Sequence, residues 1–168
     1  FQSFLSNSWW CDLEPAVQPT SDESNPAGST AESADRTESR SSPSSEWFSV
    51  WDGNWFYHST IDVQYNVTLV YLALWPRLLA IQLELWTGHV RNHRASGGSY
   101  LCHDVGIGTT VGDQAYSHAM PVEENCDYLL MLQAYTHWTG DLSIVDKHGD
   151  LLCDLTRYLI WADRDRSG

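Results

Sequence analysis

Lysine and arginine are scarce in this sequence of 168 residues, with 9 of them against 22 acidic residues and a formal net charge of −13. A surface this negative repels a phosphate backbone, so a nucleic acid partner is disfavoured. Long apolar runs are missing as well, because the best stretch, 67–85, is interrupted by proline, arginine, glutamine and glutamate. We therefore expect no membrane span.

The cysteines are few and scattered, at Cys11, Cys102, Cys126 and Cys153. This spacing excludes a zinc knuckle and a Cys-x-x-Cys redox pair, so we expect neither a metal nor another cofactor. A disulfide among the cysteines is possible, which leaves a secreted or a cytoplasmic location open. The chain opens on Phe1 without a recognisable leader. We expect it to be a fragment whose partners include the remaining segments of its parent chain.

Aromatic residues are absent from 17–45, although the whole sequence holds nine tryptophans and eight tyrosines. This stretch contains nine serines with repeated proline, threonine and acidic residues. It cannot bury enough apolar surface to offset the entropy of ordering, so 17–46 is predicted to be a disordered acidic insertion away from any cleft. It separates an N-terminal part, 1–16, from the main domain, 47–168.

The main domain has the apolar spacing of helices, which predicts an all-α fold. Helices are expected over Ile61 to Trp75, over Arg77 to about Val90, and from Pro121 to Trp138, with a fourth after an N-cap at Asp141. Residues 92–120 show no sustained period and predict a long functional loop. Helical hairpins joined by tight turns and long loops predict part of a toroid of paired helices.

Two tryptophans, Trp51 and Trp55, flank Asp52 and Gly53 just after the insertion. Aromatic faces beside a carboxylate suit a sugar subsite, although an Asp-Gly pair is also typical of an ordinary turn. Asp62 follows closely.

Further acids and a histidine occur later in the chain. His103 and Asp104 are adjacent in the long loop, where a structural histidine is an equal alternative. Glu123 and Glu124 are a pair of acids in the first turn of a helix, which is also where the helix dipole favours negative charge.

The order of these segments resembles the catalytic domain of the β-glucosidase family that includes the bile-acid β-glucosidases, an (α/α)6 barrel of the six-hairpin glycosidase superfamily. The segments that carry this resemblance are, in chain order, Trp51-Asp52-Gly53, Ser59-Thr60-Ile61-Asp62-Val63, Leu74-Trp75-Pro76-Arg77-Leu78, His103-Asp104-Val105-Gly106 and Thr139-Gly140-Asp141. The segment Met120-Pro121-Val122-Glu123-Glu124-Asn125, before an apolar helix, is similar to a motif of the fungal glutaminase A type proteins, which share the barrel.

The glucosidase resemblance implies that Asp52 is the nucleophile of a retaining reaction, although that family has glutamate there. It also implies that Asp62 and His103 bind sugar hydroxyls, so their side chains should project into one cavity. The general acid of that family lies downstream of the end of this chain.

The sequence therefore predicts a fragment of an exo-acting, retaining glycoside hydrolase whose partner is a carbohydrate substrate. Asp52 is the catalytic candidate. The substrate-binding candidates are Trp51, Trp55, Asp62, His103, Asp104, Glu123 and Glu124. One alternative is an amidohydrolase acting on glutamine, in which His103 and Glu123 or Glu124 matter more than Asp52. Another is an inactive helical module that binds glycan through its tryptophans.

Overall fold

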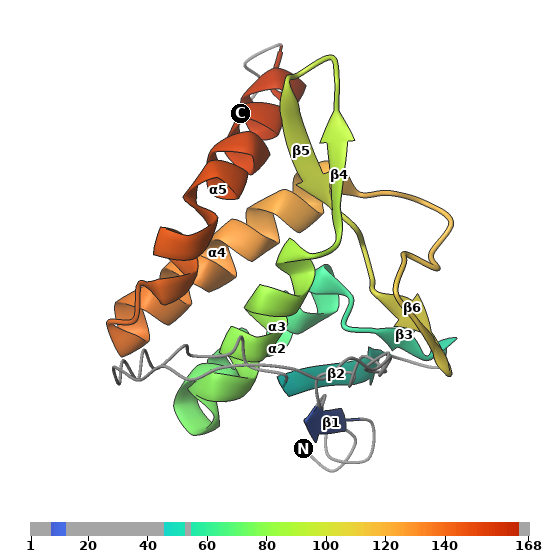
Figure 1. Ribbon diagram of the computed structural model, residues 1–168, viewed down its shortest axis with the longest axis vertical. Helices are drawn as coiled ribbons and strands as arrows, with labels where there is room; N and C mark the ends of the chain where they lie inside the picture. The colour runs from blue at the N-terminus through green and yellow to red at the C-terminus, as the bar shows by residue number, and fades with distance from the viewer. Residues whose placement is uncertain (1–7, 13–45, 53–54, 165–168) are drawn as a thin grey trace, which may run out of the picture.

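A computed structural model of the chain describes residues 8–12, 46–52 and 55–164 (Figure 1). Helices dominate these residues and form two hairpins. The first hairpin is α2 (Ile61–Leu74) with α3 (Pro76–Thr87), and the second is α4 (Pro121–Thr139) with α5 (Ser143–Ala162). Helix α2 packs against α4, so the two hairpins share one core. Among the described residues, every helix is too short or too polar to span a lipid bilayer.

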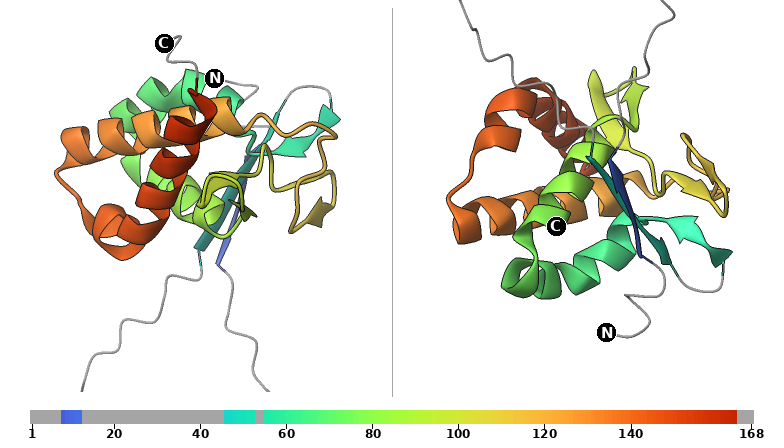
Figure 2. Two further views of the ribbon diagram at one scale, coloured as in Figure 1. Left: turned by 90° about the horizontal axis from the view of Figure 1, so that it is seen from above. Right: turned by 60° about the horizontal axis from the view of Figure 1, so that its bottom comes forward.

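Short antiparallel strands accompany the helices. One sheet has the strand order β1-β2-β3-β6-β7, and β4 pairs with β5 in a separate hairpin. The strands are β1 (Ser8–Asp12), β2 (Glu46–Asp52), β3 (Tyr57–His58), β4 (Val90–His93), β5 (Gly98–Leu101), β6 (Gly106–Ile107) and β7 (Thr110–Val111). The β4–β5 hairpin lies against α5, while β2 lies against α3 (Figure 2).

The ends of the helices follow local signals in the sequence. Pro76 begins α3 and Pro121 begins α4, because proline lacks the N–H that the first turn of a helix leaves unpaired. Gly140 ends α4 with a φ of 75°, a conformation that glycine adopts without strain. The predicted starts at residues 61 and 121 are confirmed.

The predicted end of the second helix and the predicted N-cap of the fourth were wrong, and the limits predicted at residues 75, 77 and 138 were each off by one residue. Helix α3 ends at Thr87, because the chain from Val90 enters β4. Helix α5 begins at Ser143, and Leu142 rather than Asp141 is its N-cap. Asp141 still accepts a hydrogen bond from the Ser143 N–H at 2.9 Å. Its carboxylate therefore contacts the first residue of α5 although Leu142 is the N-cap residue.

The all-α prediction is corrected by the two small sheets. The segment 92–120, predicted as an irregular loop, contains β5, β6 and β7 and part of β4. Strands of two to four residues are too short to show an alternating pattern in the sequence, and pairing with distant segments forms them. The described helices form two hairpins, and a closed (α/α)6 toroid stays a prediction.

The predicted insertion lies outside the described residues, apart from its last residue. Glu46 begins β2, so the predicted boundary at residue 46 overlaps a strand by one position. The predicted N-terminal part, 1–16, is described only over β1, which pairs with β2.

Large aromatic and aliphatic side chains fill the space between the hairpins. The fully buried ones include Trp86, Tyr71, Tyr128, Leu79, Leu83 and Met131. The Trp86 indole N–H donates to the Ser59 carbonyl oxygen at 2.9 Å, and the Tyr128 hydroxyl donates to the Leu83 carbonyl oxygen at 3.3 Å. These bonds satisfy the polar ends of buried rings, as a stable core requires.

Gly98, in β5, is expected to tolerate no larger residue. A Cβ there would lie 2.8 Å from the Tyr158 backbone nitrogen and closer still to the Asp154 carbonyl oxygen, both in the backbone of α5. We expect Gly98→Ala to lower the free energy of unfolding by about 1–3 kcal/mol, because β5 and α5 must separate.

The control for this substitution is Gly149, which lies in α5 itself and around which a Cβ would meet nothing within 4 Å. Gly149→Ala should be neutral or stabilise the helix by up to about 1 kcal/mol in the same urea denaturation measurement. Equal losses of stability in the two variants would contradict the packing argument.

Candidate functional site

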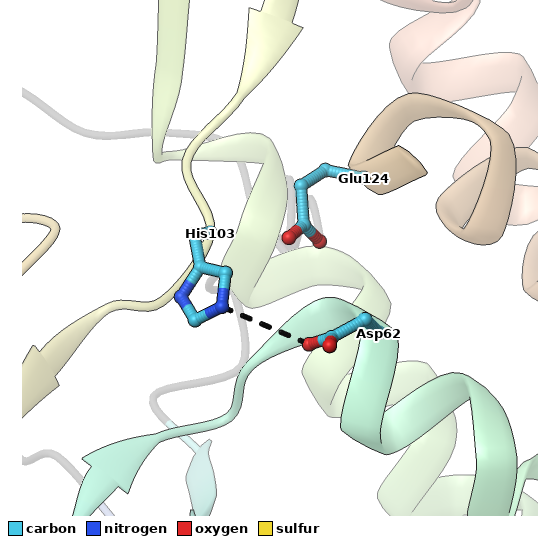
Figure 3. Close-up of side chains that lie close together, drawn as sticks. All are labelled: Asp62, His103 and Glu124. Carbon is cyan, nitrogen blue, oxygen red and sulfur yellow. Dashed lines mark ion pairs between the residues drawn. The ribbon is translucent and has the colours of Figure 1, made fainter. Parts of the chain in front are cut away.

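Three segments that are far apart in the sequence bring Asp62, His103 and Glu124 together (Figure 3). Asp62 is in the first turn of α2, His103 follows β5, and Glu124 is in the first turn of α4. One side-chain nitrogen or oxygen of each residue lies within 4.8 Å of those of the other two. The His103 Nε2 atom is 3.8 Å from the Asp62 Oδ1 atom. We refer to these three residues as the acid–histidine cluster.

Backbone hydrogen bonds hold the His103 segment beside the start of α2. The Ile61 N–H donates to the His103 carbonyl oxygen at 3.1 Å, and the Val105 N–H donates to the His58 carbonyl oxygen at 3.0 Å. The first bond also satisfies one of the free N–H groups at the helix N-terminus. Asp62, the next residue of α2, is therefore held close to His103.

Asp104 fixes the orientation of the His103 ring. Its Oδ2 atom lies 3.0 Å from His103 Nδ1, and its two oxygens also accept hydrogen bonds from the backbone N–H groups of Gly106, Ala115 and Tyr116. Burial would raise the pKa of Asp104, but these hydrogen bonds outweigh it and hold the pKa below the ordinary value. Because an ionised carboxylate only accepts, the shared hydrogen belongs to Nδ1. In the neutral imidazole, the lone pair of Nε2 then faces the cluster.

Two tyrosine rings restrict the His103 ring further. The Tyr116 ring lies over it, with ring centroids 4.4 Å apart and the planes tilted by 30°, and the Tyr57 ring meets it edge-on at 6.2 Å. Neither tyrosine was a candidate from the sequence, because nothing in their spacing distinguishes them from other aromatic residues. The imidazole is thus positioned by three neighbours before any ligand binds.

Glu124 is fully buried, and neither of its carboxyl oxygens accepts a hydrogen bond within the described part of the chain. Burial, together with the charges of Asp62, Glu123 and Asp127, raises its pKa to about 9. The nearby backbone N–H of Asp62 offsets a small part of this increase without forming a hydrogen bond of normal geometry. By itself, therefore, the cluster keeps Glu124 protonated at neutral pH.

The negative charges of the cluster also affect Asp127, one turn further along α4. Burial, together with the charges of Glu123 and Asp62, raises the pKa of Asp127 to about 6. The Oδ1 atom of Asp62 is buried and has no hydrogen-bond partner among the described residues. Acids with so few donors around them are costly to bury and are typical of places where a ligand supplies the missing interactions.

Asp52 lies outside the cluster and has a different environment. Its Oδ2 atom accepts hydrogen bonds from the Thr60 N–H and hydroxyl, both at 2.6 Å, and its Oδ1 atom accepts one from Gln64 Nε2 at 2.8 Å. Burial raises its pKa to about 6 despite these bonds. Both oxygens are occupied by donors at the start of α2, which favours a structural role. Its role as a nucleophile stays a prediction.

The remaining candidates are also spread apart. The Trp51 indole N–H donates to His58 Nε2 at 2.9 Å, and Trp55 is 73% exposed. Glu123 is exposed, next to Glu124 but on the outer side of α4. Asp104 is fully buried behind His103, where it positions the ring. Sugar binding by these residues stays a prediction.

Asp62 and His103 lie side by side, as a shared cavity would require, and their binding of one ligand stays a prediction. Which of Glu123 and Glu124 joins them could have been inferred from helix periodicity. Glu124 is four residues before Tyr128 and seven before Met131, so a helix starting at Pro121 places it on the buried face.

Residues 44–165 match the family described as the glutaminase A six helical-hairpin domain. No curated protein matches the chain. The family match covers most of the sequence and all of the acid–histidine cluster. It agrees with the resemblance to the glutaminase A type proteins and gives no support to the resemblance to the bile-acid β-glucosidases.

Proposed function

Because the chain belongs to the family of glutaminase A six helical-hairpin domains, we propose that it takes part in hydrolysis of the side-chain amide of glutamine. We place the reaction at the acid–histidine cluster. The supporting observation is that Asp62 and Glu124 present buried oxygens that no group in the described part of the chain satisfies. A purely structural cluster would be expected to satisfy them internally.

The chemistry of the cluster suits amide hydrolysis. Water adds its oxygen to the amide carbon, the carbon–nitrogen bond breaks, and the nitrogen leaves as ammonia after gaining a proton. Carboxyl groups and an imidazole within reach of one another can move these protons. The fixed ring of His103 and the confined position of Glu124 reduce the rearrangement that such a site needs before it reacts.

Glycoside hydrolysis and glycan binding are the competing hypotheses, and the exposed ring of Trp55 is the feature that favours them. A small amino acid needs less stacking surface than a sugar ring. The proposed nucleophile of that route, however, has both oxygens engaged by Thr60 and Gln64. This arrangement favours the amidohydrolase.

We expect the full-length protein that carries this chain to release ammonia from L-glutamine and to leave aryl glucosides and aryl xylosides intact. The His103→Ala variant tests whether this activity depends on the cluster. Its kcat/KM for glutamine should be lower by about 100-fold or more if the imidazole takes part in proton transfer. Release of nitrophenol from a nitrophenyl glucoside, with no ammonia released from glutamine, would contradict the amidohydrolase hypothesis and support the glycosidase hypothesis. Binding of a glycan without turnover of any substrate would support the inactive module.

A further inference from the structure

The three groups of the acid–histidine cluster have the spacing of ligands around one small ion. One imidazole nitrogen and two carboxylate oxygens all lie within 4.8 Å of one another. A tetrahedral ion with bonds of about 2.0–2.2 Å places its ligand atoms about 3.3–3.6 Å apart. The 3.8 Å between His103 Nε2 and Asp62 Oδ1 is close to this separation, and the other two pairs, within 4.8 Å, would approach it by side-chain rotation on binding.

The cluster also contains carboxyl oxygens that no donor among the described residues satisfies. Asp62 Oδ1 and both oxygens of Glu124 are buried without a hydrogen-bond partner among the described residues. The Glu124 side chain extends from α4 toward His103 and Asp62 rather than toward solvent (Figure 3). A bound cation would supply these oxygens with the interactions that the described residues do not.

His103 is oriented as a metal ligand is. Ligating histidines generally donate the hydrogen of their other ring nitrogen to a carboxylate or carbonyl, which fixes the tautomer and the direction of the lone pair. The contact between His103 Nδ1 and Asp104 Oδ2, at 3.0 Å, has this arrangement. Asp104 is itself held by three backbone N–H groups, so the ring cannot easily turn away.

We propose that Asp62, His103 and Glu124 bind one divalent transition-metal cation, with Zn²⁺ as the preferred ion. The imidazole ligand favours Zn²⁺ over Mg²⁺ and Ca²⁺, which prefer sites made of oxygen alone. Three protein ligands leave a coordination position for water or a substrate oxygen, as in catalytic rather than structural zinc sites. The absence of paired cysteines therefore does not exclude a metal site here.

Metal binding is measured on the full chain after treatment with EDTA and dialysis, by calorimetric titration with ZnCl₂ and by elemental analysis. One Zn²⁺ should bind per chain, and Co²⁺ in its place should give visible absorption bands of a low-symmetry site. His103→Ala and Glu124→Gln should each weaken Zn²⁺ binding by at least about 100-fold, since each removes a ligand. Asp104→Asn should weaken it by about 10- to 100-fold through the orientation of His103.

The matched control is Glu123→Gln, which removes an equal charge from the adjacent, exposed position. It should change Zn²⁺ affinity by less than about threefold, because only long-range electrostatics is altered. Circular dichroism verifies that each variant is folded, and Glu124→Gln tests the site even if Asp104→Asn fails to fold.

Two results would count against the proposal, and they are distinguishable. No stoichiometric Zn²⁺ binding, or binding that is equal in the ligand variants and the control, would overturn the metal site. The metal proposal rests on the proposed function, because both use the acid–histidine cluster. Measuring glutamine hydrolysis in EDTA distinguishes failure of the metal proposal from failure of the proposed function. Glutamine hydrolysis that persists in EDTA would overturn a catalytic role for the metal while leaving the proposed function in place.

Discussion

Replacing Glu124 with glutamine is expected to stabilise the metal-free protein at pH 8 while it removes activity on glutamine. The pKa of Glu124 is raised to about 9 in the folded chain, well above the ordinary value of 4.5. Between these two values the folded protein keeps the proton and the unfolded chain loses it. The free energy of unfolding therefore falls as pH rises through this window, by up to about 1.4 kcal/mol per pH unit from this group.

A glutamine at position 124 does not titrate, so this loss disappears. Its side-chain N–H can also donate toward the buried oxygen of Asp62, which has no hydrogen-bond partner within the described ranges of the wild-type chain. We expect Glu124→Gln to be more stable than the wild type by about 2 kcal/mol or more at pH 8, and nearly equal to it at pH 5. Urea denaturation in EDTA at both pH values measures this difference.

The control for this experiment is Glu123→Gln, which leaves Glu124 in place and should retain the loss of stability toward high pH. Parallel pH profiles for the wild type and Glu124→Gln would show that Glu124 is not buried as a protonated acid. A gain of stability together with a loss of activity is the pattern expected of a residue retained for function.

Replacing Asp52 with asparagine is expected to weaken the fold much more than the chemistry. The new amide would place N–H donors against Gln64 Nε2 or the Thr60 N–H, which are themselves donors to the carboxylate. Gln64 cannot simply turn over, because its Oε1 atom accepts a hydrogen bond from the Tyr71 hydroxyl at 2.6 Å. We expect the free energy of unfolding to fall by about 2 kcal/mol.

Activity per folded molecule separates this structural role from that of a nucleophile. If Asp52 only holds the start of α2, kcat for glutamine at a temperature where the variant is folded should stay within about tenfold of the wild type. If Asp52 forms a covalent intermediate, kcat on the productive substrate should fall by several orders of magnitude. The second result would restore the mechanism that the glucosidase resemblance implied.

The helices could be predicted because their signals are local. Pro76, Pro121 and Gly140 act through their own backbone geometry, so each marks a helix end wherever the chain lies. The short strands could not be predicted in this way. Tyr57 pairs with Ile107, far along the chain, and such pairing depends on tertiary contacts rather than on a pattern in either segment.

The candidate site was predictable in part for the same reason. The order of the segments predicted that Asp62 and His103 lie together, with which the 3.8 Å between them agrees, and the paired glutamates indicated a helix start. The function of Asp104 depends on N–H groups at 106, 115 and 116, which approach it only when the loop folds. The prediction that no metal binds considered cysteine spacing, whereas the acid–histidine cluster combines oxygen and nitrogen ligands from three distant segments.

The most direct measurement of where the reaction takes place is kcat/KM for L-glutamine in the Asp62→Asn variant. The Asp62 side chain is 28% exposed, the substitution preserves its shape and it removes a charge next to Glu124, so the urea midpoint should be no lower than that of the wild type. We expect kcat/KM to fall by about 100-fold or more, because the cluster loses one of its two carboxylates. A folded Asp62→Asn variant with wild-type kcat/KM would contradict the assignment of the reaction to the acid–histidine cluster.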